Sequence, residues 1–232
     1  MATDLRKTET VAPSAGKHRR PRRERWRAGL RIFGVLCLVG AVGVAGYLAW
    51  LLWGTGLETK AAQEDLRAGF ERSIGSLSPR DPSADKVRLP GRAIAELVIP
   101  RMDLDMIVVE GTGTDELKKG PGHYSEGSFP YVDTAYPWEN RGRVGIAGHR
   151  TTYGAPFWDL DKVRAGDKIV LKTEYGIFTY EVTKTEVIPS SGSGVVLEQT
   201  RKPTLVLTTC NPRFSAEQRL VVFADRVKAA AG

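Results

Sequence analysis

The hydrophobic and polar positions divide the chain into stretches of different character. Residues 1–31 are polar and basic with no apolar period, so no structure is expected there. From Ile32 to Trp53 there are 22 residues without a charged side chain, and about 20 suffice to cross the hydrocarbon core of a bilayer. After Gly91, short apolar runs alternate with turn residues, a pattern typical of β-strands. The chain is therefore expected to hold one membrane helix and a separate β-rich domain.

Residues 54–90 have the composition of a stalk between these two parts. The segment from Glu58 to Ile74 is compatible with a helix, with Leu66, Phe70 and Ile74 on one face. A stretch rich in proline follows, which is typical of a linker. The sequence leaves open whether the helix packs on the following domain or stands alone.

The β-rich domain is expected to span residues 91–232. The runs that indicate strands are 93–100, 104–111, 143–148, 167–173, 176–188, 204–209 and 219–227. A hairpin turn is expected at Glu174-Tyr175, directly before Gly176. Short helical turns are expected near 114–119, 157–163 and 195–199. Strands of this number and length, mostly antiparallel, favour a closed or nearly closed barrel. No glycine-rich phosphate loop followed by a helix is present.

The charge of the chain gives its orientation. The net charge is +7, from 34 basic and 27 acidic residues, and residues 1–31 hold ten of the former and three of the latter. The rest of the chain is therefore formally neutral, and nucleic acid is not expected as a partner. Because positive flanks stay in the cytoplasm, the N-terminus is expected inside, near anionic lipid, and the β-rich domain outside. A cleaved signal peptide is the alternative, but its apolar region would span only about 7–15 residues.

Two residues of the exported part suggest nucleophilic catalysis. Cys210 is its single cysteine; it ends an apolar strand and precedes the turn Asn211-Pro212. His149 likewise ends a predicted strand and precedes a polar loop. A thiolate can attack a carbonyl, and a nearby imidazole can take or return the proton. The plainer interpretation of Cys210, as a buried apolar filler, stays open.

A cationic group is expected beside these two residues. Attack on an amide creates an oxyanion that requires preorganised donors. If the last two strands pair antiparallel, Arg219 lies beside Cys210, whereas Arg213 lies in the intervening turn and is expected to be solvated. Arg219 is therefore the favoured candidate.

At this point two segments resemble the sortase family. TLVLTTC, with arginine nine positions later in QRLVVF, is similar to its cysteine signature, and AGHRTTYGAPFWDL resembles its histidine segment. Together with GPGHY at 120–124, they most resemble the class E sortases of actinobacteria. The resemblance covers roughly residues 93–228 and depends on the two segments occurring in this order.

The resemblance implies an eight-stranded β-barrel and a cysteine transpeptidase without a cofactor. Its substrates would be secreted proteins with a sorting signal, cleaved between Thr and Gly, and its acceptor an amine of a peptidoglycan precursor such as lipid II. It also implies Cys210 as nucleophile, His149 as general acid and Arg219 as the group that binds substrate or oxyanion. Class E sortases prefer LAxTG-type over LPxTG-type signals. Tyr124, with Tyr153 second, is the candidate for that preference.

Further candidates have plainer alternatives. His123 either lines the substrate pocket or is a loop histidine bonded to backbone. Thr208 and Thr209 either bond to the substrate backbone or cap a strand end. Three acidic residues either contact Ca²⁺ or form an exposed acidic face, the second being favoured: Asp103, Asp105 and Glu110. Two separated histidines and one cysteine do not predict a metal site.

Two other kinds of protein compete with a sortase. An L,D-transpeptidase is also β-rich and uses Cys and His, but its nucleophile segment resembles S-x-G-C-x-R, whereas this chain has TTCNPR. A non-catalytic envelope module with an incidental cysteine is the other alternative. It would not react with a thiol-directed analogue of a sorting peptide.

Overall fold

The computed structural model describes residues 22–75, 91–125, 132–192 and 194–230. The chain divides into two compact units, residues 1–46 and 47–232, which are described separately. The predicted linker after residue 75 lies outside the described residues as far as residue 90.

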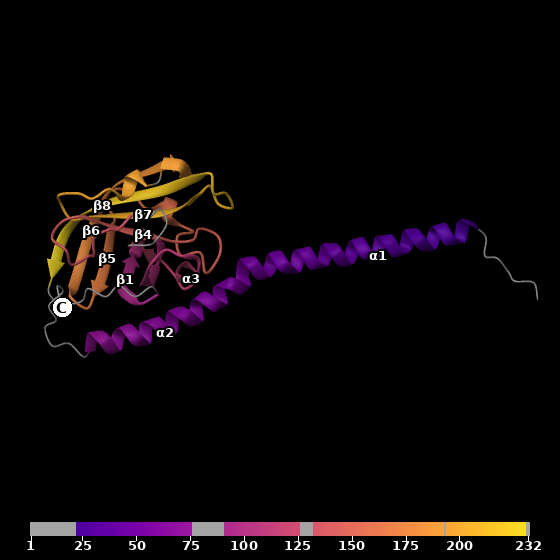
Figure 1. Ribbon diagram of the computed structural model, residues 1–232, viewed down its shortest axis with the longest axis horizontal. Coiled ribbons are helices and arrows are strands. Elements are labelled where there is room, and N and C mark those ends of the chain that lie inside the picture. The colour runs from indigo at the N-terminus through magenta and orange to yellow at the C-terminus, as the bar shows by residue number, and fades with distance from the viewer. Residues whose placement is uncertain (1–21, 76–90, 126–131, 193, 231–232) are drawn as a thin grey trace, which may run out of the picture. The chain divides into compact units, whose positions relative to one another are not determined.

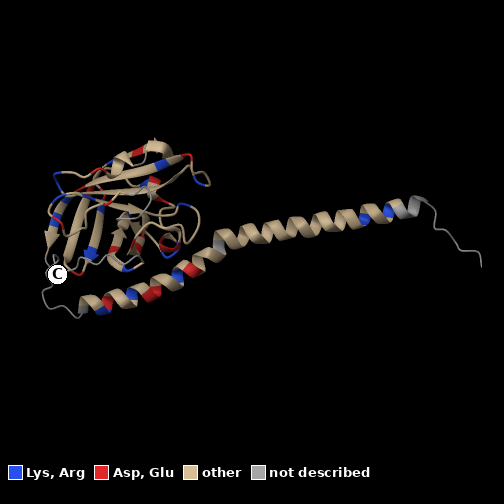
Figure 2. Cartoon of the chain, viewed as in Figure 1, with Lys and Arg blue, Asp and Glu red and all other residues tan. Residues whose placement is uncertain are grey.

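The first described element is α1 (Arg22–Ala49), which is free of charged residues beyond Arg31 (Figures 1 and 2). The expectation of no structure in the basic segment is wrong for its last ten residues, which are helical. Arginine, alanine and leucine are good helix formers, so the apolar helix extends backward into them. The continuous helical run Trp26–Ile74 includes one segment long and apolar enough to cross a membrane by length and composition.

Eight strands form a closed barrel in the order β1-β2-β3-β4-β7-β8-β6-β5 (Figure 1). The strands are β1 (Ala93–Ile99), β2 (Leu104–Glu110), β3 (Gly122–His123), β4 (Arg143–Ala147), β5 (Lys168–Thr173), β6 (Gly176–Pro189), β7 (Thr204–Asn211) and β8 (Gln218–Ala230). The predicted barrel is thus confirmed, and seven of these strands match predicted runs. β3 has no predicted counterpart, because two residues carry no recognisable alternation. The pairs β2–β3 and β4–β7 are parallel.

The connections also follow the predicted pattern. The β5–β6 hairpin turns at Glu174-Tyr175, with Thr173 paired to Gly176. A short helix, α3 (Thr114–Leu117), and 3-10 turns at Leu160–Lys162 and Val195–Leu197 lie where helical turns are expected. Further 3-10 turns lie at Pro100–Met102 and Ser190–Gly192.

Strands β7 and β8 are apolar on both faces. Leu205, Leu207 and Val222 belong to the barrel core, while Val206 and Val221 belong to a second cluster. That second cluster packs under the 3-10 turn Val195–Leu197 and includes Tyr124 at its margin. The alternation of a strand therefore places the even-numbered residues of β7 on the side of this outer cluster.

The sequence left open whether the helix after the apolar segment packs on the following domain, and in the structure it does. A π-helical turn, Trp50–Gly54, leads into α2 (Thr55–Gly75), which packs on the barrel. Gln63 donates its amide to the carbonyls of Ile107 and Lys119, at 2.9 and 2.8 Å, and accepts from the Ile107 N–H at 2.7 Å. The side-chain amide of Gln63 therefore attaches this helix to the barrel.

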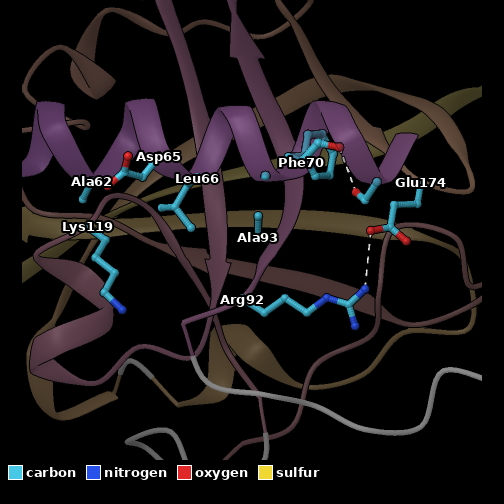
Figure 3. Close-up of a pocket in the computed structure, with 10 residues that line it drawn as sticks. Ala62, Asp65, Leu66, Phe70, Arg92, Ala93, Lys119 and Glu174 are labelled. Carbon is cyan, nitrogen blue, oxygen red and sulfur yellow. Dashed lines mark hydrogen bonds and ion pairs between the residues drawn. The ribbon is translucent and has the colours of Figure 1, made fainter. Parts of the chain in front are cut away.

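The apolar face of α2 that the sequence indicates is buried less completely against the barrel than expected. Phe70 is buried, but Leu66 and Ile74 are only partly buried. A cavity of about 430 Å³ lies between α2 and the start of β1, with the ion pair Arg92–Glu174 at its edge (Figure 3). None of the catalytic candidates lines this cavity.

Candidate active site

The nucleophile candidate lies on the outer face of the barrel. Cys210 pairs with Arg219 across β7 and β8, with no register shift along the pair of strands. By the strand alternation, Cys210 shares its face with Val206 and Arg219 shares its face with Val221, both of the outer cluster. Both side chains are partly exposed. The thiol and the guanidinium thus belong to one face, as the sequence predicts.

His149 reaches the same end of the barrel from β4. Ala147 pairs with Thr208 in the parallel β4–β7 ladder, and His149 and Cys210 each follow two residues later. The Gly148 N–H donates to the Thr208 carbonyl at 3.1 Å, which continues this ladder toward His149. The histidine is partly exposed, and its ring contacts that of Tyr153 at a centroid distance of 5.1 Å.

Tyr124 and Thr208 form a pair beside the nucleophile. The Tyr124 hydroxyl and the Thr208 hydroxyl are hydrogen-bonded at 2.9 Å, and Thr208 lies on the same face of β7 as Cys210. Burial raises the pKa of the Tyr124 phenol, while the bond to Thr208 and the positive charge of Arg219 oppose that rise. The phenol therefore stays protonated at neutral pH and can donate a hydrogen bond.

Two other predicted substrate-binding residues face elsewhere. Thr209 is buried on the opposite face of β7, and its hydroxyl donates to the Gly148 carbonyl at 2.7 Å. His123 is fully buried, with Nε2 3.0 Å from the Ala135 carbonyl and Nδ1 3.4 Å from Glu110. These contacts fit a role in holding the scaffold, which is the plainer alternative for both residues.

The exposed acidic face that the sequence suggests is only partly present. Glu110 is 2% exposed and accepts a hydrogen bond from the Tyr136 hydroxyl at 3.0 Å. The expectation that it belongs to an exposed face is therefore wrong. Asp105 is exposed and pairs with Arg67 of α2 at 2.7 Å.

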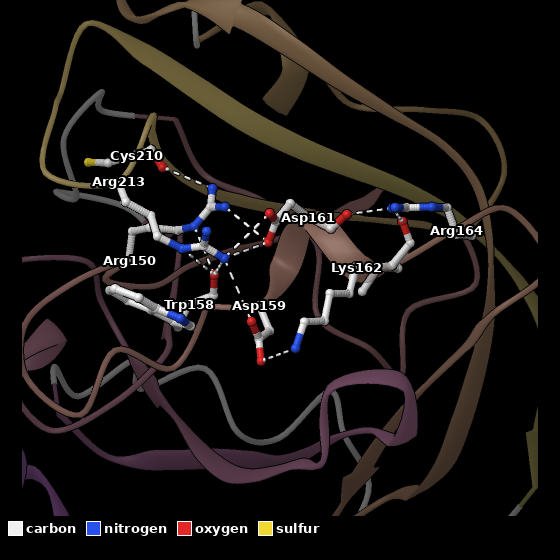
Figure 4. A network of polar contacts seen from close by, with 9 residues as sticks. Arg150, Trp158, Asp159, Asp161, Lys162, Arg164, Cys210 and Arg213 are labelled. Atoms are coloured by element: carbon white, nitrogen blue, oxygen red, sulfur yellow. Dashed lines mark hydrogen bonds and ion pairs between the residues drawn. The ribbon is translucent and has the colours of Figure 1, made fainter.

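An arginine network next to the site was not predicted. Arg150, which follows His149, is 4% exposed and donates to the carbonyls of Trp158 at 3.1 Å and Cys210 at 3.3 Å (Figure 4). It also pairs with Asp161 at 3.1 Å. Arg150 therefore ties the histidine loop to the backbone of the nucleophile. The only sequence signal was a basic residue beside His149, which is indistinguishable from a solvated one.

Arg213 joins the same network and is only partly solvated, with its side chain 32% exposed. It donates to the Trp158 carbonyl at 2.9 Å and to Asp161 at 3.0 Å, and its guanidinium stacks on the Trp158 ring. Its role in this geometry is to hold the β7–β8 turn, which includes the cis peptide Asn211–Pro212. Arg219 keeps its place as the arginine on the nucleophile's face.

The electrostatics of the histidine favour its neutral form. Burial lowers the pKa of His149 below its ordinary value of 6.5. A neutral imidazole can accept the thiol proton and later give it to a leaving amine. The arrangement of thiol, imidazole and guanidinium can thus support acyl transfer through a thioester.

Comparison with known proteins agrees with this geometry. The family model described as "Sortase domain" matches residues 97–227, which is more than half of the chain. The chain belongs to the sortase family. Because sortases are cysteine transpeptidases, this chain is an enzyme of that class. Sortase D of Bacillus subtilis strain 168 is 30% identical over 207 residues, covering 85% of this chain and 98% of the relative.

Class E sortases are among the similar proteins, as the motifs imply. Sortase SrtE1 of Streptomyces coelicolor is 28% identical, covering 85% of this chain and 57% of the relative. The crystal structure of sortase E1 from the same organism, with a tripeptide in the active site, has a TM-score of 0.56 and 31% identity. It covers 62% of this chain and 94% of that structure. An L,D-transpeptidase and a non-catalytic module are not supported.

Proposed function

We propose that this sortase is membrane-anchored and joins secreted proteins to the cell wall. It would cleave an LAxTG- or LPxTG-type sorting signal between Thr and Gly, and transfer the Thr carbonyl to an amine of a peptidoglycan precursor such as lipid II. The observation that carries this proposal is the register pair Cys210–Arg219, with His149 at the same end of the neighbouring strand.

The first half of the reaction forms the thioester. His149 first takes the proton of the Cys210 thiol; the thiolate then attacks the threonine carbonyl carbon, and the carbonyl electrons move onto oxygen. When this oxyanion collapses, the bond between carbon and the glycine nitrogen breaks, and protonated His149 gives its proton to the leaving amine. The part of the sorting signal that begins with glycine departs, and the threonine stays on sulfur as a thioester.

The second half transfers the threonine to the acceptor. An amine of the cell-wall precursor attacks the thioester carbon and loses a proton to His149, which is now neutral. Collapse of the second oxyanion breaks the carbon–sulfur bond and releases the thiolate, which takes its proton back from His149. The product is a new amide, and the pair Cys210 and His149 returns to its starting protonation.

Arg219 is suited to stabilise both oxyanions. One of its terminal nitrogens donates to the carbonyls of Ala216 at 2.9 Å and Gln218 at 3.0 Å, which fixes the guanidinium. A guanidinium carries five N–H donors in a planar fork, so further donors stay available to a carbonyl oxygen. Tyr124 and Thr208, hydrogen-bonded on the same face, are proposed to contact the signal.

Anchoring is proposed from the N-terminal part. The apolar helix would cross the membrane once, with the basic residues 1–31 in the cytoplasm and the sortase domain outside. The partners would then be the bilayer, secreted proteins with sorting signals and the lipid-linked acceptor. The basic tail needs no nucleic acid to explain it, because anionic lipid headgroups attract it.

The test uses the full chain purified in detergent. LAETG and LPETG peptides are added with or without a diamino acceptor, and mass spectrometry follows the Cys210 adduct and the transferred product. We expect a thioester without acceptor, a new amide with it, and neither in the Cys210→Ala variant. A muropeptide stem without a sorting signal should give no adduct. An active Cys210→Ala protein, or a folded chain that forms no adduct with either peptide, would overturn the proposal.

A further inference from the structure

The loop that follows His149 has a strained backbone. Tyr153 and Ala155 have φ values of 51° and 44°, and Gly154 between them has 70°. Side-chain-bearing residues rarely adopt the left-handed region, because their Cβ atoms crowd the backbone. Two such residues in one turn persist only where the surroundings hold them. The contacts of this loop therefore determine whether the histidine segment keeps its shape.

One of these contacts comes from the first residue of α2. The Thr55 hydroxyl accepts the backbone N–H of Tyr153 at 3.0 Å and donates to the Leu51 carbonyl at 2.8 Å. Thr55 is 2% exposed, so water does not replace either partner readily. The loop is thereby attached to a helix that begins 94 residues before His149 in the sequence.

Thr59, one helical turn later, completes the attachment. It is also 2% exposed, and its hydroxyl donates to the Lys118 carbonyl at 2.7 Å. Its methyl carbon lies 3.3 Å from the point where a Cβ on Gly154 would sit. Gly154 thus packs closely over the helix, and its positive φ is compatible with glycine.

The far side of the loop leads to the imidazole. The rings of Tyr153 and His149 are in contact, with centroids 5.1 Å apart and planes tilted by 39°. At the other end, the Phe157 N–H donates to the His149 carbonyl at 3.1 Å. The ring of His149 is therefore bounded by a residue whose backbone is fixed by Thr55.

We propose that Thr55 and Thr59 are positioning residues for proton transfer. By holding Tyr153 and Gly154, they set the imidazole of His149 at the angle from which it reaches the leaving amine. The helix after the apolar segment is then part of the catalytic apparatus as well as a connection to it. This inference rests on the proposed role of His149 as general acid. Neither threonine touches substrate, so their loss slows the chemical step and leaves peptide binding unchanged.

The chain offers a conservative series and a matched control. Thr55→Val keeps the shape and removes the hydroxyl, whereas Thr55→Ser keeps the hydroxyl. Thr173 is the control, because its hydroxyl is also buried, donates to the Gly176 carbonyl at 3.0 Å and accepts the Tyr175 N–H at 3.1 Å. It lies in the β5–β6 hairpin, and none of its described hydrogen bonds reaches the catalytic residues.

The experiment measures kcat and KM for sorting-peptide cleavage by the full chain in detergent. It also records NMR spectra with ¹³C-labelled histidine, in which the chain's three histidines give few signals and His149→Ala assigns the one of interest. For Thr55→Val we expect kcat to fall by about 10- to 100-fold, as for a misplaced catalytic group, with KM unchanged. The His149 resonance should shift or broaden. Thr55→Ser and Thr173→Val should match the wild type in both readouts.

Three results would overturn the inference. One is a Thr55→Val protein with wild-type kcat and an unchanged His149 resonance. Another is an equal loss of kcat in Thr173→Val, and a third is a rise in KM that accounts for the whole effect. If the wild type cleaves no peptide, the proposed function fails, and the His149 resonance alone decides the positioning role. If Thr55→Val does not fold, Thr59→Ser, which removes only the methyl facing Gly154, gives the same readouts.

Discussion

Cys210 and Arg219 lie directly opposite each other on antiparallel strands, on either side of the six-residue turn, residues 212–217, that joins β7 to β8. The last pair before the turn, Asn211 and Gln218, is also joined by a side-chain hydrogen bond of 2.8 Å. The register of a single hairpin therefore places a cation beside the Cys210 thiol, on the outer face of the barrel. Because a slip of one residue would turn either side chain to the other face, the proposed mechanism requires this register.

The first prediction concerns the guanidinium. Arg219→Lys should lower kcat for peptide cleavage by about 10²- to 10³-fold, the cost of losing an oxyanion donor, because an ammonium lacks the planar fork. Steady-state kinetics with an LAETG peptide measures the effect. Arg226→Lys is the matched control, since Arg226 lies on the same strand and donates to the Pro137 and Glu139 carbonyls. Comparable losses in both variants would contradict a specific role for Arg219.

A second prediction concerns signal preference. Tyr124→Phe removes the phenol and leaves the Thr208 hydroxyl, bonded to it at 2.9 Å, without that partner. We expect the ratio of kcat/KM for LAETG over LPETG to fall by about ten-fold, equivalent to about 1.4 kcal/mol and comparable to one hydrogen bond. Tyr153→Phe, whose ring contacts His149, should change kcat for both peptides alike. A constant ratio in Tyr124→Phe would remove this residue from the specificity assignment.

The sequence predicts the barrel and the catalytic candidates for a clear reason. Alternation and strand ends are local patterns, and Cys210, His149 and Arg219 each lie at the end of a predicted strand. Contacts made by polar side chains over long distances leave no such pattern. Arg150 looks like a solvated residue in the sequence, yet it is buried among three partners, Trp158 and Asp161 of the following segment and the carbonyl of the distant Cys210. Thr55 likewise has no distinguishing pattern in the sequence, although its hydroxyl accepts the N–H of Tyr153, 98 residues away.

The third prediction follows from that convergence. Arg150→Lys should lower the free energy of unfolding by about 1–3 kcal/mol, because a buried ammonium does not reproduce the fork and leaves carbonyl groups unpaired. Arg213→Lys should cost less, since Arg213 is more exposed and shares Trp158 and Asp161 with Arg150. Urea unfolding followed by tryptophan fluorescence gives both values. Equal losses would mean that burial of Arg150 contributes nothing.

The fourth prediction is the titration of His149. Burial lowers its pKa, so its ¹³C-NMR midpoint should lie below the ordinary 6.5. Because the folded-state pKa lies below the unfolded one, protonation favours unfolding. The stability that the neutral ring contributes is therefore complete above about pH 6.5 and is lost as the pH falls toward the folded-state pKa. His149→Gln should reduce this acid-induced loss. A midpoint at or above 6.5 would contradict the burial argument.

The last prediction tests how tightly the histidine segment is packed. A Cβ on Gly148 would lie 2.6 Å from Cδ2 of Phe157, whose ring is fully buried in the barrel core and cannot move aside. Gly148→Ala should therefore lower the free energy of unfolding by about 1–3 kcal/mol, as for an overpacked core. It should also slow cleavage, because the displaced backbone carries His149. Gly192→Ala is the control, since an added Cβ there meets no described atom within 4 Å. If Gly148→Ala matched Gly192→Ala in unfolding and in kcat, the segment would have more freedom than these contacts allow.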